Sequence, residues 1–160
     1  MRQIRDKLMK NIYFDSIMVI ERLHRLFLEV TRIELDRLKI KDINNVQCFI
    51  LYNIAENHLT VGEISNRGYY LGSNVTYNLK KMVETGYLIQ EQSSHDRRSS
   101  HIRLSEKGLK LYQRFDQILS EHTKNMKHNG IAEQDLKNLK SLLARLESFW
   151  NFTVTHDMRF

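Results

Sequence analysis

Apolar residues recur every three or four positions over long stretches at both ends of this 160-residue chain, which contains no proline. The spacing predicts one long amphipathic helix over residues 8–38 and two more over 105–127 and 132–150. Apolar stripes of this kind have to be buried against another surface. A compact lobe of this size cannot cover all three, so we expect a second copy of the chain to do so.

The net charge is +6 and the sequence pI is about 9.5, which favours an acidic partner, nucleic acid before an anionic membrane. The hydrophobic fraction of 41% and the charged fraction of 28% are typical of a globular chain. A single cysteine, Cys48, excludes an internal disulfide and favours a reducing compartment. No signal peptide or membrane-spanning run is apparent, so we expect a cytoplasmic protein that does not enter a membrane.

The middle of the chain predicts a series of shorter elements. Residues 46–55 are apolar on most sides, which indicates a central helix. Thr60 and Glu63 have the spacing of a capping box at the start of a short helix. A further helix is expected over 72–85, with Gly86 as its stop. A short helix, a tight turn and a second helix make up a helix-turn-helix, whose second helix would read DNA.

That second helix divides into two faces. Val75, Leu79 and Met82 share the apolar one. The other face carries small polar, aromatic and basic residues, namely Ser73, Asn74, Thr76, Tyr77, Lys80 and Lys81. Asn pairs well with base edges, Ser and Thr bond bases or phosphates, and Tyr and Lys suit phosphate oxygens. A solvated helix face of the same composition is the competing interpretation.

Residues 87–92 are typical of a strand, and residues 100–104 alternate polar and apolar as a second strand should, so the two predict a β-hairpin directly after this helix. Its tip holds Asp96, Arg97 and Arg98. An arginine on such a loop can enter the minor groove beside a helix in the major groove. The alternative is an exposed ion pair that contributes little. Helix pair and hairpin together describe a winged helix.

We therefore predict a mainly α fold with a small β-hairpin wing. It would consist of a winged helix-turn-helix lobe at 41–104 and a long helical dimerisation region, formed by 1–40 and 105–150. Residues 151–160 are predicted to be a tail.

The segment from Asp96 to Gly108 fits the pattern D-x-R-x-x-x-hydrophobic-x-L-T-x-x-G, with Arg98, Ile102 and Leu104 in place. This resembles the wing signature of the MarR family of bacterial transcription regulators. The upstream segment SNVTYNLKKMVETGYLI resembles the family's reading helix, its closing glycine and the following strand. The resemblance covers nearly the whole chain. Ser105 replaces the usual threonine, and either hydroxyl can cap a helix.

The resemblance implies an obligate homodimer on a pseudo-palindromic operator of double-stranded DNA, with half-sites about 10 bp apart. Repression is the family's default. Arg98 would be the minor-groove arginine, oriented by Asp96, and Arg97 would share its role. The resemblance also implies release by a small aromatic or phenolic effector. The candidate pocket residues are Phe27, Phe49, Tyr52 and Tyr112, which could equally be ordinary core aromatics.

Other kinds of function find less support in the sequence. Cys48 lies among apolar neighbours, so its use as a thiol-based redox sensor is a minor alternative. The histidines form no metal-binding motif, and we expect no metal, no cofactor and no enzymatic activity. Two further alternatives are a winged-helix module that docks an acidic protein and a membrane binder that uses residues 1–40.

Overall fold

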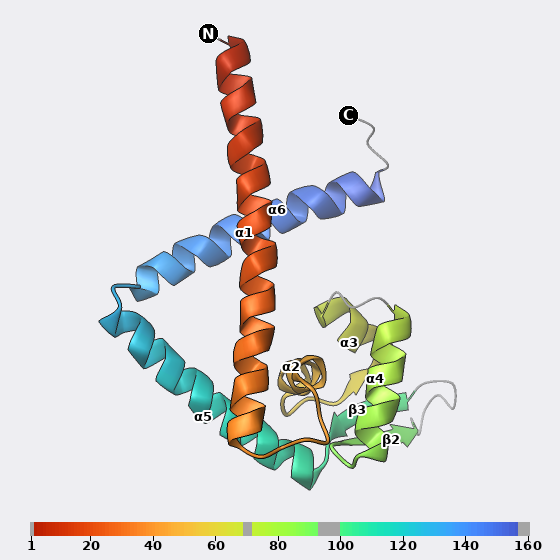
Figure 1. Ribbon diagram of the computed structural model, residues 1–160. Helices are drawn as coiled ribbons and strands as arrows, with labels where there is room; N and C mark the ends of the chain where they lie inside the picture. The colour runs from red at the N-terminus through yellow and green to blue at the C-terminus, as the bar shows by residue number, and fades with distance from the viewer. Residues whose placement is uncertain (1, 69–71, 93–99, 157–160) are drawn as a thin grey trace. The chain divides into compact units, whose positions relative to one another are not determined.

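The computed structural model of the chain describes residues 2–68, 72–92 and 100–156. The elements are, in chain order, α1 (Arg2–Arg37), α2 (Asn45–Ile54), β1 (Leu59–Thr60), α3 (Val61–Gly68), α4 (Gly72–Glu84), β2 (Leu88–Gln92), β3 (Ser100–Leu104), α5 (Glu106–His128) and α6 (Glu133–Thr155) (Figure 1). The mainly α fold with a small hairpin, predicted from the sequence, is confirmed. The chain forms two compact units, Met1–Gln113 and Arg114–Phe160.

Three boundaries differ from the sequence-based prediction. Helix α1 starts at Arg2 instead of residue 8, because residues 2–7 are mostly good helix formers and include no Gly or Pro. Helix α6 continues to Thr155, so the first residues of the predicted tail at 151–160 are helical. Residues 59–60 form a strand that was not predicted, because two residues are too few for alternation to reveal a strand.

The three strands form one antiparallel sheet in the order β1-β3-β2. Leu88 lies opposite Leu104 at the base of the predicted hairpin, and Gln92 lies opposite Ser100 at its outer end. Leu88, Leu104 and the intervening Ile102 are buried, while Glu91 and Gln92 are exposed. The hairpin is therefore anchored to the core at its base, and its outer end projects from it.

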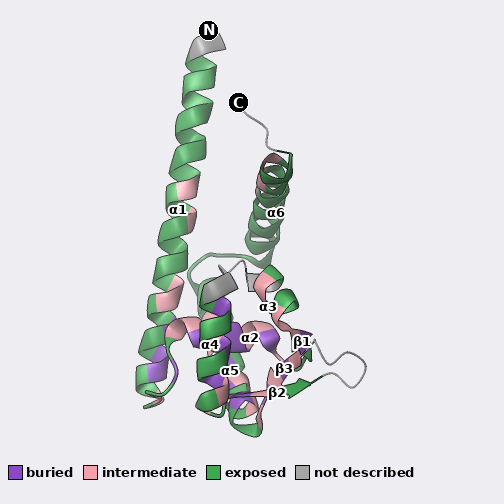
Figure 2. Ribbon diagram, turned by 90° about the vertical axis from the view of Figure 1, so that its right-hand side faces the viewer, coloured by how far each residue is buried: buried purple, intermediate pink, exposed green. Residues whose placement is uncertain are grey.

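The core of the first unit is built around α2, as the sequence predicts for a central helix. Cys48, Ile50, Leu51 and Ile54 of this helix are all 0% exposed. The neighbouring elements add further buried residues, namely Ile64 from α3, Val75, Leu79 and Met82 from α4, and Tyr87, Leu88 and Ile102 from the sheet region. Figure 2 shows these buried positions gathered around α2.

Capping interactions fix the starts of α2 and α3. The Gln47 backbone N–H donates to the Asn44 side chain at 2.8 Å, and the Asn44 N–H donates to the Gln47 side chain at 3.1 Å. The predicted capping box of α3 is confirmed, since the Thr60 N–H donates to the Glu63 carboxylate at 2.7 Å. Each box satisfies backbone donors that a helix start leaves without a partner.

Candidate nucleic-acid interface

Helix α4 has one buried face and one polar face, as the sequence predicts. Val75, Leu79 and Met82 are at most 3% exposed, and their spacing of four and three residues places them on one side. The side chains at the other predicted positions are exposed, namely Asn74, Thr76, Tyr77, Lys80 and Lys81. Ser73 lies in the first turn of α4, and its side chain is outside the described part of the chain.

The polar face presents an aromatic ring and basic groups to solvent. Tyr77 is 69% exposed, which is unusual for a large ring and leaves it available to a partner. The Asn78 amide donates to the Asn74 carbonyl at 2.8 Å, within the helix. Lys81 Nζ lies 3.8 Å from the Glu84 carboxylate, which partly neutralises the acid at the end of this helix. The face therefore suits an anionic surface.

The end of α4 is closed as the sequence predicts, at Gly86. This glycine has φ +77°, a left-handed conformation that residues with a side chain rarely adopt. The Gly86 N–H donates to the Val83 carbonyl at 3.0 Å and the Tyr87 N–H donates to the Met82 carbonyl at 2.9 Å. These two bonds form a Schellman motif, which turns the chain directly from α4 into β2.

Side chains tie the two hairpin strands together. The Arg103 guanidinium donates twice to the Glu91 carboxylate, at 2.6 and 2.9 Å, and holds the pKa of that carboxyl below its usual value. The Gln90 amide donates to the Ser100 hydroxyl at 2.9 Å. The predicted wing residues Asp96, Arg97 and Arg98 lie outside the described residues, between these two strands.

The four aromatic residues predicted to line an effector pocket form two ring pairs. Phe27 of α1 and Phe49 of α2 meet edge to face, with centroids 5.7 Å apart. Tyr52 of α2 and Tyr112 of α5 are tilted by 31° with centroids 5.2 Å apart. All four rings are half-buried. The sequence predicted these four residues as pocket-lining or core aromatics, and only the fold shows how they pair, with one member of each pair on α2.

Cys48 is fully buried within α2, and burial raises the pKa of its thiol to about 12. The thiolate is the reactive form of cysteine, so at pH 8 only about one molecule in ten thousand would carry it. We expect iodoacetamide at pH 8 to leave the folded protein unmodified while it modifies urea-unfolded protein, as followed by mass spectrometry. Comparable rates for the two states would instead support the redox-sensor alternative.

Neither a membrane span nor a metal site is found in the described part of the chain. No helix in the described ranges is both long and apolar enough to cross a membrane. Within the same ranges, no three His, Cys, Asp or Glu residues are arranged to share a metal ion. His95, one of the histidines beside the predicted wing tip, falls outside them.

Comparison with known proteins identifies the family. The MarR family model matches residues 41–99, which contain α2, β1, α3, α4 and β2. The exopolysaccharide II synthesis transcriptional activator ExpG of Rhizobium meliloti (strain 1021) is 38% identical over 138 residues, which cover 86% of this chain and 71% of the relative.

Two solved structures share the fold. Streptococcus pneumoniae FabT in complex with DNA gives a TM-score of 0.69 at 19% identity, covering 87% of this chain and 97% of that one. Staphylococcus aureus MarR in complex with salicylate and kanamycin gives a TM-score of 0.70 at 21% identity, covering 89% and 93%. The helix-turn-helix, the hairpin and the similarity to the Rhizobium activator together show that this chain belongs to the MarR family of winged helix-turn-helix transcription regulators.

Proposed function

We propose that this regulator binds a pseudo-palindromic DNA operator as a homodimer, with one α4 in the major groove of each half-site. The observation that carries the proposal is the division of α4, whose apolar face is buried and whose polar, basic face is exposed. A transcription regulator works where the chromosome lies, so the proposal includes a cytoplasmic location. It assigns the chain no catalytic role.

The residues of the interface divide by chemistry. Ser73, Asn74, Thr76 and Tyr77 come from the first half of α4, the part of a reading helix that contacts base edges. Lys80 and Lys81 lie further along and suit phosphates. At the wing, Arg98 and Arg97 would reach the minor groove, with Asp96 orienting the guanidinium.

Exposed apolar rows on α1 and α6 support the homodimer. On α1 the exposed row is Ile4, Leu8, Ile12, Val19, Leu23, Leu26, Val30 and Ile33. On α6 it is Leu136, Leu139, Leu142, Leu143 and Phe149, and no residue of this helix is buried (Figure 2). Continuous rows of this length mark a protein interface. A second copy of the chain, related by a two-fold axis, would cover them and match a near-palindromic operator.

A small aromatic effector is the proposed release signal. The two ring pairs, Phe27–Phe49 and Tyr52–Tyr112, offer aromatic surfaces to such a molecule at half-buried positions. The Staphylococcus aureus relative was solved with salicylate, an aromatic acid. Release requires that the effector bind one spacing of the two reading helices more tightly than the other.

The direction of regulation is set by where the operator lies in the promoter. Repression is the expectation from the family resemblance, whereas the Rhizobium relative is called an activator. An operator that overlaps the promoter supports repression, and one upstream of it supports activation. Expression of a reporter fused to the promoter, compared with and without the regulator, shows whether regulation is repression or activation.

The proposal is tested by mobility shift and footprinting on the DNA upstream of the protein's own gene, over a series of salt concentrations. We expect a protected near-palindrome, bound about a thousandfold or more tightly than random DNA, with an affinity that falls steeply as salt rises. Binding to the promoter and to genomic fragments no tighter than to random DNA would contradict it. Such a result would favour the protein-docking alternative.

Replacing Arg98 by Ala tests the wing. We expect operator affinity to fall about tenfold with the dimer intact, because an arginine in the minor groove contributes both charge and shape recognition. Arg114→Ala is the matched control, since it removes the same charge from an exposed position on α5. Equal affinities for Arg98→Ala and the parent would remove the wing from the interface.

A further inference from the structure

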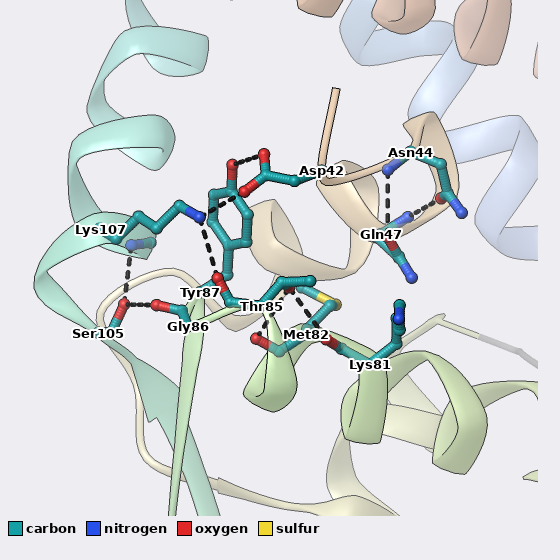
Figure 3. A network of polar contacts seen from close by, with 11 residues as sticks. Asp42, Asn44, Gln47, Lys81, Met82, Thr85, Gly86, Tyr87, Ser105 and Lys107 are labelled. Carbon is teal, nitrogen blue, oxygen red and sulfur yellow. Dashed lines mark hydrogen bonds and ion pairs between the residues drawn. The ribbon is translucent and has the colours of Figure 1, made fainter. Parts of the chain in front are cut away.

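Three side chains from distant parts of the sequence meet at the end of α4 (Figure 3). The Tyr87 hydroxyl donates to one carboxylate oxygen of Asp42 at 2.7 Å. The Lys107 ammonium donates to the other oxygen of that carboxylate. It also donates to the Thr85 carbonyl at 2.9 Å and lies 4.0 Å from the centroid of the Tyr87 ring.

These contacts join three segments of the first unit. Asp42 lies in the connection between α1 and α2, Thr85 follows α4, and Lys107 is in the first turn of α5. We call the cluster of Asp42, Tyr87 and Lys107 the joint. Ser105 reinforces it, because its hydroxyl donates to the Gly86 carbonyl at 2.6 Å and its N–H donates to the Tyr87 carbonyl at 3.0 Å. The C-terminal end of α4 is thus bonded both to the start of α5 and to the connection between α1 and α2.

The joint fixes the orientation of α4 more than it stabilises the fold. The side chains of Lys107 and Asp42 are 46% and 50% exposed, and ion pairs that exposed contribute little to stability. Lys107 is held in three directions, by a carboxylate, a carbonyl and a ring face, so its position is well defined. Its positive charge also lies at the C-terminal end of α4, where the helix dipole favours a cation.

We propose that Asp42, Tyr87 and Lys107 are positioning residues for operator recognition, which fix the angle of α4 against α1 and α5. The inference rests on the proposed homodimer and its operator. Helices α1 and α5 both belong to the proposed dimerisation region. Because the joint fixes α4 against them, it also sets the distance between the two α4 helices of a dimer. That distance determines which half-site spacing the protein accepts. None of the three residues needs to touch DNA for this role.

The test uses the operator found by footprinting, together with versions whose half-sites are moved one base pair closer or further apart. The full-length variants are Asp42→Asn, Tyr87→Phe and Lys107→Met. Lys110→Met is the matched control, because it breaks another exposed ion pair one turn further along the same helix. Lys107→Arg keeps the charge and should restore much of the parent's behaviour. Circular dichroism and sedimentation confirm that each variant is folded and dimeric.

We expect the parent and Lys110→Met to bind the natural spacing about a hundredfold more tightly than either altered spacing. In the variants of Asp42, Tyr87 and Lys107 this ratio should fall about tenfold, because an α4 that is held less firmly can also adapt to the altered spacings. A purely structural role would weaken binding to all spacings equally and leave the ratio unchanged.

Spacing ratios equal to the parent's in Asp42→Asn and Tyr87→Phe would overturn the inference, whether or not Lys107→Met folds. These two substitutions change single polar groups and preserve side-chain volume. Failure of the parent itself to prefer any operator over random DNA would instead contradict the proposed function. The two failures are therefore distinguishable.

Discussion

Replacing Leu142 by Glu is expected to dissociate the proposed homodimer and abolish operator binding with it. Leu142 is 59% exposed near the middle of α6, in the apolar row assigned to the partner copy. A carboxylate buried there without a partner costs about 3 kcal/mol or more, which corresponds to a dimer roughly a hundredfold weaker. Sedimentation velocity at micromolar concentration measures the first effect, and a mobility shift measures the second.

Ala144→Glu is the matched control for this substitution. It introduces the same charge into the same helix at an exposed position, two residues on and so about 200° around the helix axis. Glu is also a good helix former, so neither substitution should unfold α6. A Leu142→Glu variant that remained dimeric and bound its operator would show that this row of α6 lies outside the interface.

Gly108→Ala is expected to destabilise the protein by about 2 kcal/mol, although the same change normally stabilises a helix. A Cβ at position 108 would overlap the carbonyl oxygen of Tyr87 and lie 3.2 Å from its carbonyl carbon. The obstacle is backbone, so no side-chain rotation can relieve it. The Tyr87 carbonyl also accepts the Ser105 N–H, which holds it in place. Urea unfolding at one protein concentration measures the change.

Gly62→Ala provides the comparison. Its Cβ would meet only the Thr60 hydroxyl, at 4.0 Å, within ordinary contact distance. We expect this variant to be as stable as the parent or more stable by up to about 1 kcal/mol. If Gly108→Ala behaved in the same way, the close approach of α5 to the end of α4 would not be a constraint. The close approach would then also fail to explain why the wing motif has a glycine at position 108.

Local patterns predicted α4, the helix proposed to read DNA. The buried Val75, Leu79 and Met82 follow a spacing that is visible in the sequence, and their burial leaves the polar residues of α4 exposed. The stop at Gly86 and the capping box at Thr60 also depend on residues close together in the chain. Where neighbours in sequence determine the structure, the sequence was sufficient.

Contacts between distant residues could not be predicted in this way. Asp42 and Lys107 are 65 positions apart, and each looks like an ordinary surface charge in its own segment. Strand β1 is defined only by its pairing with β3, through Leu59 with Ile102 and Thr60 with His101. The pairing of Phe27 with Phe49 likewise depends on how α1 crosses α2. These features follow from packing, which one sequence does not reveal residue by residue.

Thr60 belongs to two structures at once. It pairs with His101 in the sheet, and its N–H and hydroxyl both donate to Glu63 at the start of α3. Strand β3 of the hairpin and the start of α3 are thus joined at Thr60. When the protein meets DNA, these two parts do not have to be ordered against each other. The loss of conformational entropy for that alignment has already occurred during folding, and it does not weaken binding.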